Sequence, residues 1–124
     1  MVILQGDVFW FDPGIPYGSA PGFLRPHVVV QNDAFNSSRI RTTVLCSITS
    51  NLGRAKAAGN VLLHKGEANL SRASVVNVSH IVTVDKSLLK EKIGTLSQSR
   101  VREIDAGLRA VLGPREVPRS PHQP

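Results

Sequence analysis

The hydrophobic pattern of this chain changes its period once, near residue 97, and that change most constrains the fold. Before it, apolar residues come in short runs rich in β-branched side chains. Within residues 74–84 apolar and polar residues alternate, which is typical of a half-buried strand. After it, apolar residues recur at helical spacing at Val101, Ile104, Leu108 and Val111. The pattern predicts a β-rich α+β domain of antiparallel strands followed by one C-terminal helix, with the sheet closed into a partly open barrel.

The expected strands are short and separated by turn residues. They cover residues 6–12, 27–31, 42–49, 60–64 and 74–84. In the last of these, the pattern places Val76, Val78, Val82 and Val84 on one face together with His80. A capped helical turn is expected at 85–88, and Ser97 or Thr95 is expected to cap the final helix, which Gly113-Pro114 ends. Residues 13–26 contain four prolines and three glycines and are expected to form a long functional loop.

A length of 124 residues fits one domain, which we expect to span residues 1–112. Residues 113–124 hold four of the eight prolines and are expected to be a disordered tail. One cysteine, Cys46, excludes an internal disulfide, and its apolar neighbours predict a buried thiol. The sequence begins without a basic, apolar leader and has no run long enough to cross a membrane, so we expect a cytoplasmic protein.

The net charge of +6 is unevenly distributed along the chain. Residues 34–72 carry six basic residues against the single acidic Glu67. Ten of the fifteen basic residues are arginines, whose planar guanidinium suits phosphate groups. Basic connections beside a sheet predict either a solvated face or a surface for a nucleic-acid backbone.

The sequence lacks the usual signatures of phosphate loops, dinucleotide sites and zinc sites, and its five aspartates are scattered, so no metal or cofactor is expected. Any hydrolysis would then have to proceed without a metal. RNA permits this, because its 2′-OH is a nucleophile already held near the phosphate. An arginine can stabilise the charge on the phosphate, and a hydroxyl can assist it. Arg25 and Thr49 fit these roles by residue type, although composition alone does not select them.

Motifs in a consistent order give the chain a family resemblance. They are Gly-Asp-Val-Phe-Trp-Phe-Asp at 6–12, Gly18-Ser19 followed by Arg25-Pro26, Val-Val-Val-Gln-Asn-Asp at 28–33, Ser-Ile-Thr-Ser at 47–50, and Ile-Val-Thr-Val-Asp-Lys at 81–86. Over roughly residues 4–112 the chain resembles the MazF/PemK/Kid toxins of bacterial toxin–antitoxin systems. The resemblance implies an SH3-like, CcdB/MazF-type partly open β-barrel with a C-terminal helix, and a homodimer.

The same resemblance implies a function and site residues. The expected function is a type II toxin that cleaves single-stranded mRNA sequence-specifically without metal, leaving 2′,3′-cyclic phosphate and 5′-OH ends. The expected partner is a MazE-like antitoxin with a disordered C-terminal segment. Arg25 carries over as the catalytic arginine, Thr49 as the assisting hydroxyl, and Ser19 as a substrate contact. The recognised RNA sequence is expected to depend on the loops 13–26 and 50–59.

Further candidates come from strand phase and charge. His27 lies two residues from Arg25, on the same face of a strand, and is either a proton shuttle or a structural histidine. The expected RNA-binding residues are Ser19, Gln31, Ser50, Arg54 and Lys56. Trp10 is expected in the core rather than under a stacked base.

Three residues depart from the family pattern. Ala20 stands where the family often has Glu, and His80 and Val82 where Gln and Arg are common. These changes concern substrate or antitoxin contacts.

The alternative functions are a non-enzymatic CcdB-like toxin that binds DNA gyrase, and a non-catalytic RNA-binding barrel.

Overall fold

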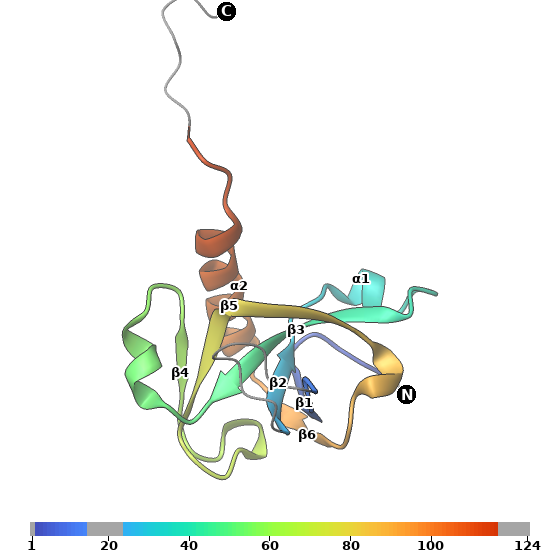
Figure 1. Cartoon of the computed structure of the whole chain (residues 1–124), viewed down its shortest axis with the longest axis horizontal. Coiled ribbons are helices and arrows are strands. Elements are labelled where there is room, and N and C mark those ends of the chain that lie inside the picture. Colours follow the sequence, from blue (N-terminus) through green and yellow to red (C-terminus); the bar gives the residue numbers. More distant parts are fainter. Residues whose placement is uncertain (1, 15–23, 117–124) are drawn as a thin grey trace, which may run out of the picture.

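Six strands pair in one antiparallel sheet with the order β4-β5-β3-β2-β1-β6 (Figure 1). The computed structural model describes residues 2–14 and 24–116. The strands are β1 (Asp7–Phe11), β2 (Arg25–Val29), β3 (Thr42–Thr49), β4 (Val61–Leu63), β5 (Ser74–Asp85) and β6 (Lys92–Thr95). The helices are α1 (Asp33–Asn36) and α2 (Gln98–Leu112), with 3₁₀ turns η1 (Leu52–Lys56), η2 (Glu67–Asn69) and η3 (Lys86–Leu88). This confirms the expected β-rich α+β fold with a C-terminal helix.

The sheet curls into a half-barrel, and a turn bridges its two edges. β4 and β6 are the edge strands. The η2 turn that follows β4 reaches β6, where the Asn69 side-chain amide donates to the Ile93 carbonyl at 3.0 Å. The backbone of Ala68 packs directly on Gly94 of β6. Figure 1 shows this segment curling beneath the sheet. The barrel is therefore closed at this end by a turn and stays open along its strands.

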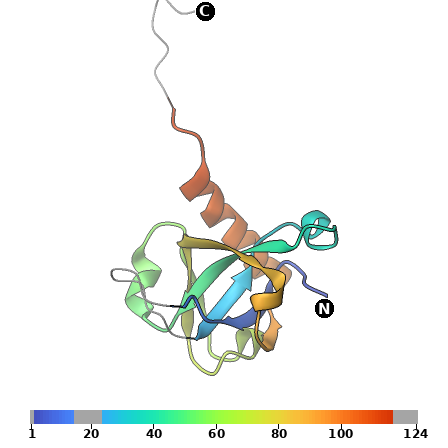
Figure 2. The same cartoon turned by 45° about the vertical axis from the view of Figure 1, so that its right-hand side comes forward.

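The sheet is buried on both faces. On one face Val28, Cys46, Val76 and Val78 pack against Ile104 of α2. On the other, Phe9, Phe11, Val29, Leu45 and Val84 form a second cluster with Ile3 and Leu89. Central strands covered on both sides need continuous apolar runs, which explains Val28-Val29 and Leu45-Cys46. In Figure 2 the helix α2 lies diagonally across the first of these faces.

The long strand β5 corrects the expectation of a single apolar face. The β3–β5 register shifts between Cys46 and Ser47. Cys46 pairs with Ile81, whereas the next residue, Ser47, pairs with Asn77. This irregularity turns the strand, so Val76 and Val78 join the α2 cluster while Val82 and Val84 face the other one. His80 lies at the shift and is half-buried.

The helix boundaries follow local hydrogen bonds. Ser97 caps α2 by accepting the Arg100 amide at 3.2 Å, and Gly113 ends it, as expected. Thr95 is not the cap, because it belongs to β6 and donates to the Asp7 carboxylate at 2.8 Å. Asp85 caps the η3 turn as expected. Residues 15–23, with Ser19 and Ala20, and residues 117–124 of the expected tail lie outside the described residues.

Candidate active site

A groove of about 360 Å³ opens where β2 begins and β3 ends. Its wall combines the ends of β1, β2 and β3 with β6 and the segment that leads into β5. Its lining residues are Trp10, Leu24, Arg25, Pro26, Ile48, Thr49, Ser50, Asn69, Leu70, Ser71, Arg72, Ser74 and Ile93. Both residues expected to be catalytic, Arg25 and Thr49, therefore lie in one groove.

The strand register explains how Arg25 and Thr49 meet. His27 of β2 pairs with Ser47 of β3 in an antiparallel register. Arg25 precedes His27 by two residues and Thr49 follows Ser47 by two, so both lie at the end of this pairing that borders the groove. Side chains two apart on a strand share a face. Residues 24 positions apart in the chain are thus brought together by ordinary strand pairing.

Both side chains keep hydrogen-bonding capacity for a ligand. The Thr49 Oγ1 accepts the Asn51 amide at 3.2 Å, which leaves its own O–H to donate. The Nε of Arg25 is buried and has no hydrogen-bond partner within residues 2–14 and 24–116. Nor does Arg25 form an ion pair there. A buried guanidinium N–H without a partner is costly, so an anionic ligand that reaches this atom would gain a charge-assisted hydrogen bond.

His27 supports the strand that carries Arg25. Its Nδ1 lies 3.0 Å from the Arg25 carbonyl oxygen, which can only accept, so Nδ1 carries the proton and donates. The ring is 1% exposed and packs edge-on against Phe11 at 5.2 Å between centroids. The pKa of His27 is lowered to about 4, mainly by burial and to a smaller extent by the neighbouring charges of His80 and Arg25, while the hydrogen bond to Arg25 opposes the shift. His27 is therefore neutral at pH 7 and outside the groove lining, which favours a structural role over a proton shuttle.

Acid should destabilise the fold through His27. The unfolded chain binds a proton near pH 6.5, whereas the folded chain resists it to about pH 4. The free energy of unfolding should therefore fall as pH drops through this interval, by about 3 kcal/mol in total. Urea titrations of wild type and His27→Leu across this range measure the effect. The variant should lose most of this pH dependence. If the free energy of unfolding changed equally with pH in both proteins, His27 would not be its source.

A second histidine lies close by, at the register shift of β5. The Nδ1 of His80 is 2.7 Å from the Ser47 hydroxyl oxygen. This contact joins β5 to β3 two residues before Thr49. His80 therefore has the hydrogen-bond partner expected of a histidine at the core edge.

Comparisons with known proteins place the chain in a family. The profile of the PemK-like, MazF-like toxin of type II toxin–antitoxin systems matches residues 4–112. This chain belongs to that family. The proteins named endoribonuclease MazF2 of Mycobacterium bovis and endoribonuclease MazF6 of Mycobacterium tuberculosis are each 44% identical to it over 112 residues, 90% of this chain and 98% of theirs. The resemblance in the sequence motifs is thereby confirmed.

Solved structures show the same fold. An endoribonuclease in complex with its cognate antitoxin from a mycobacterial species superposes with a TM-score of 0.73 at 24% identity, covering 92% of this chain and 98% of that one. MazF from Deinococcus radiodurans superposes with a TM-score of 0.71 at 25% identity, covering 91% and 98%. The half-barrel with its C-terminal helix is therefore the MazF toxin fold, as expected.

The other expected RNA-binding residues of this MazF-family chain are dispersed. Ser50 lines the groove. Arg54 and Lys56 are exposed on η1, the turn shortly after β3. Gln31 lies beyond the end of β2, and its amide donates inward to Asn36 and to the Thr42 carbonyl. Ser19 lies outside the described residues.

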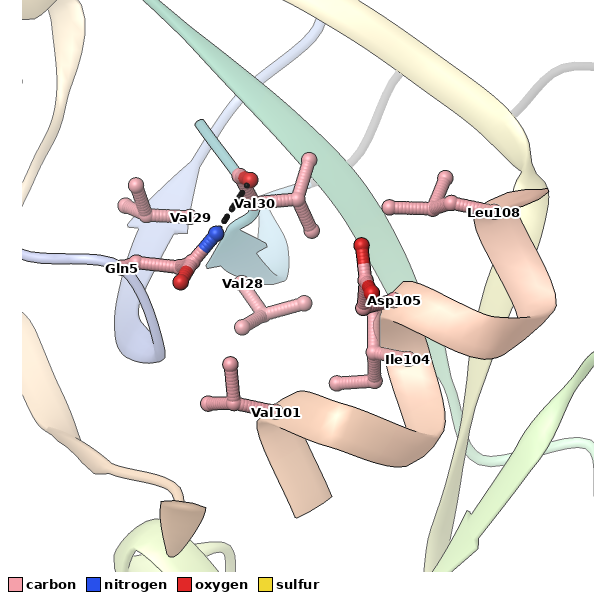
Figure 3. A pocket seen from close by; sticks show the side chains of 8 residues that line it. All are labelled: Gln5, Val28, Val29, Val30, Val101, Ile104, Asp105 and Leu108. Atoms are coloured by element: carbon pink, nitrogen blue, oxygen red, sulfur yellow. Dashed lines mark hydrogen bonds between the residues drawn. The ribbon is translucent and has the colours of Figure 1, made fainter. Parts of the chain in front are cut away.

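A second, much smaller cavity has a different character (Figure 3). It measures about 20 Å³ and lies between β2 and α2, bordered by Val28, Val101 and Leu108. Gln5 spans one side and donates to the Val30 carbonyl at 3.0 Å. A space of this size holds about one water molecule, so it is a packing gap and not a substrate site.

Sequence reasoning missed one wall of the groove. Trp10 is half-buried in this wall and belongs to neither apolar cluster, which corrects the expectation of a core tryptophan. Residues 69–72 were not singled out, although Arg72 was counted in the basic segment. Their position depends on left-handed backbone at Ala68 and Asn69, and an alanine gives no sequence signal of that conformation.

The thiol of Cys46 lies outside the groove. Cys46 is fully buried, and burial raises the pKa of its thiol to about 12, which makes it a poor nucleophile.

Among the described residues, no three His, Cys, Asp or Glu side chains gather where they could hold a metal ion. No helix in the described part of the chain is long and apolar enough to cross a membrane.

Proposed function

We propose that this chain is the toxin of a type II toxin–antitoxin system and a metal-independent, sequence-specific endoribonuclease for single-stranded RNA. The observation that carries the proposal is the placement of Arg25 and Thr49 in one groove, with the Arg25 Nε buried and without a partner in the described residues. The names of its relatives at 44% identity support the reaction class. We take residues 1–112 as the toxin domain, in line with the family match to 4–112.

The chemistry follows from these two side chains. The 2′-oxygen of the substrate attacks the adjacent phosphorus, the bond from phosphorus to the 5′-oxygen breaks, and a 2′,3′-cyclic phosphate and a 5′-OH result. Charge develops on the non-bridging oxygens, where the Arg25 guanidinium donates paired hydrogen bonds. Thr49 donates one more. The proton lost by the 2′-OH is balanced by one gained by the leaving 5′-oxygen, and Arg25 is the group placed to assist this transfer.

The remaining residues have supporting parts. Three residues that follow β3 are suited to bind flanking phosphates, namely Ser50, Arg54 and Lys56. Ser19 is assigned a substrate contact. His27, neutral and buried, holds the backbone of Arg25 in place.

The partners follow from the family. A MazE-like antitoxin is proposed, because relatives of this fold were solved as antitoxin complexes. A homodimer and a cytoplasmic location in a bacterium complete the proposal.

A cleavage assay on a long single-stranded RNA tests the function. The purified protein should cut at a limited set of sequences, and excess EDTA should leave the rate unchanged. Binding of RNA with no cutting would instead indicate an RNA-binding barrel. Capture of DNA gyrase with no cutting would indicate a CcdB-like toxin. Either result would contradict the proposal.

A further inference from the structure

An ion pair lies behind the part of the groove wall that residues 69–72 form. Arg100, in the first turn of α2, donates from Nε and Nη2 to the two carboxylate oxygens of Glu67 in η2, each at 2.9 Å. Neither residue is among the described residues that line the groove. Any effect of the pair on the groove therefore passes through the turn that Glu67 begins.

The turn that Glu67 begins is strained. Ala68 and Asn69 adopt φ angles of 49° and 60° in succession, in the left-handed region that residues other than glycine rarely occupy. Left-handed backbone at an alanine is costly and persists only where the surrounding structure enforces it. The wall begins at Asn69, so the contacts that enforce this conformation also set the position of the wall.

On one side, β6 holds the turn. The backbone of Ala68 packs so closely on Gly94 that a Cβ at position 94 would overlap it. The Asn69 side-chain amide donates to the Ile93 carbonyl at 3.0 Å. Both Asn69 and Ile93 line the groove, so this hydrogen bond joins two parts of its wall.

On the other side, α2 holds the turn through the carboxylate of Glu67. Two parallel hydrogen bonds from Arg100 fix the direction of the carboxylate as well as its distance. The same carboxylate accepts the His64 amide at 2.6 Å, which fixes the chain before the turn. The side chains of Glu67 and Arg100 are only 26% and 19% exposed, so water screens them less than a fully exposed pair. Hydrogen bonding to Arg100 also holds the pKa of Glu67 below its usual value.

We propose that Glu67 and Arg100 are positioning residues, which hold the wall formed by residues 69–72 in place and thereby set the width of the groove. The pair acts through η2 and leaves Arg25 and Thr49, on β2 and β3, where they are. It should therefore govern how tightly RNA is held and not the rate of the chemical step. The expected effect on RNA rests on the proposed function, whereas the effect on the groove does not.

The single tryptophan of the chain reports on the groove without any RNA. Trp10 is half-buried and lines the groove together with Asn69 and Ile93. Acrylamide quenching of its fluorescence measures how readily a small solute enters. Glu67→Gln and Arg100→Met should each raise the quenching rate constant of the folded protein about twofold, because the turn loosens. Wild-type quenching in both variants would overturn the positioning role.

Two control variants separate the contact with η2 from the loss of a charge. Glu103→Gln removes the other carboxylate that Arg100 contacts, at 3.1 Å, which lies on α2 itself. Arg109→Met repeats the substitution made in Arg100→Met, at an 80% exposed arginine that pairs with Asp105 within α2. Both controls should quench as the wild type does. An equal rise in Arg109→Met and Arg100→Met would refute the proposal, because loss of a helix charge would then be sufficient.

A conservative variant tests the fork itself. Arg100→Lys keeps the positive charge but not the two parallel donors. Its quenching should lie between that of the wild type and that of Arg100→Met. If Arg100→Lys quenched no more than the wild type, the paired geometry would not hold the wall.

Cleavage kinetics provide a readout that a loss of stability alone would not give. On an RNA with a mapped site, Arg100→Met should raise KM about tenfold and change kcat less than about twofold. An unchanged KM, or a fall in kcat alone, would contradict a role at the groove wall.

The two measurements fail separately. If the wild-type protein cuts no RNA, the proposed function is wrong, and quenching of Trp10 still decides whether the pair positions the wall. If the protein cuts RNA but the variants quench as the wild type does, the function stands and the positioning role is wrong.

Discussion

Replacing Arg25 with alanine is expected to lower the rate of RNA cleavage about a thousandfold. Arg25 lines the same groove as Thr49, and its buried Nε has no hydrogen-bond partner among the described residues. Losing it removes charge stabilisation that is strongest when the phosphate carries its extra negative charge. Single-turnover cleavage of one RNA containing a mapped site measures this.

Three comparisons make the Arg25 result specific. Arg25→Lys should recover only part of the rate, because lysine keeps the charge but not the paired donors. Thr49→Val, which removes one hydroxyl from a similar shape, should cost about a hundredfold. Arg109→Ala should retain full activity. Circular dichroism should show all the variants folded, since Arg25 makes no ion pair within the described chain. A fully active Arg25→Ala protein would contradict the assignment.

Replacing Gly107 with valine is expected to cost about 3 kcal/mol of folding free energy. Gly107 is buried in α2, and a Cβ there would overlap the backbone carbonyl of Gly59. Gly59 is itself packed between Val78 and Gly107, so its loop has little room to move away. The helix would be pushed off the cluster that contains Ile104 and Val78.

The neighbouring Ala106 supplies a matched control. It is exposed on the same turn of α2, so Ala106→Val carries the helix propensity cost of valine without the overlap. Urea unfolding of both variants isolates the close contact. If Gly107→Val and Ala106→Val were equally stable, the close contact between α2 and Gly59 would not limit the size of the side chain at position 107.

Several elements could be predicted because their signals are local. β3 matches its predicted range 42–49, since a run of β-branched residues ends there in Ser50-Asn51. α2 stops at Gly113 as predicted. β6 was missed, because Lys92–Thr95 is short and contains Gly94. The bend in β5 was missed because it depends on pairing with β3 and not on its own sequence.

The candidate site was predictable only in part. Arg25 and Thr49 were selected by family resemblance, and the antiparallel pairing of β2 with β3 accounts for their meeting in one groove although they are far apart in the chain. His27 was expected to share a face with Arg25, but its burial and its effect on pKa emerge only from packing around it. Residues 69–72 reach the groove through Glu67 and Arg100, a contact between distant elements that periodicity cannot reveal.

In the proposed reaction, the groove directs the substrate's own 2′-OH against its phosphate. The most direct measurement replaces a single ribose, the one on the 5′ side of a mapped cut, with 2′-deoxyribose in an otherwise unchanged RNA. Cleavage at that position should disappear, while cuts elsewhere persist and end in 2′,3′-cyclic phosphate and 5′-OH. Continued cutting at the deoxy position would show that another nucleophile acts, and would contradict the roles given to Arg25 and Thr49.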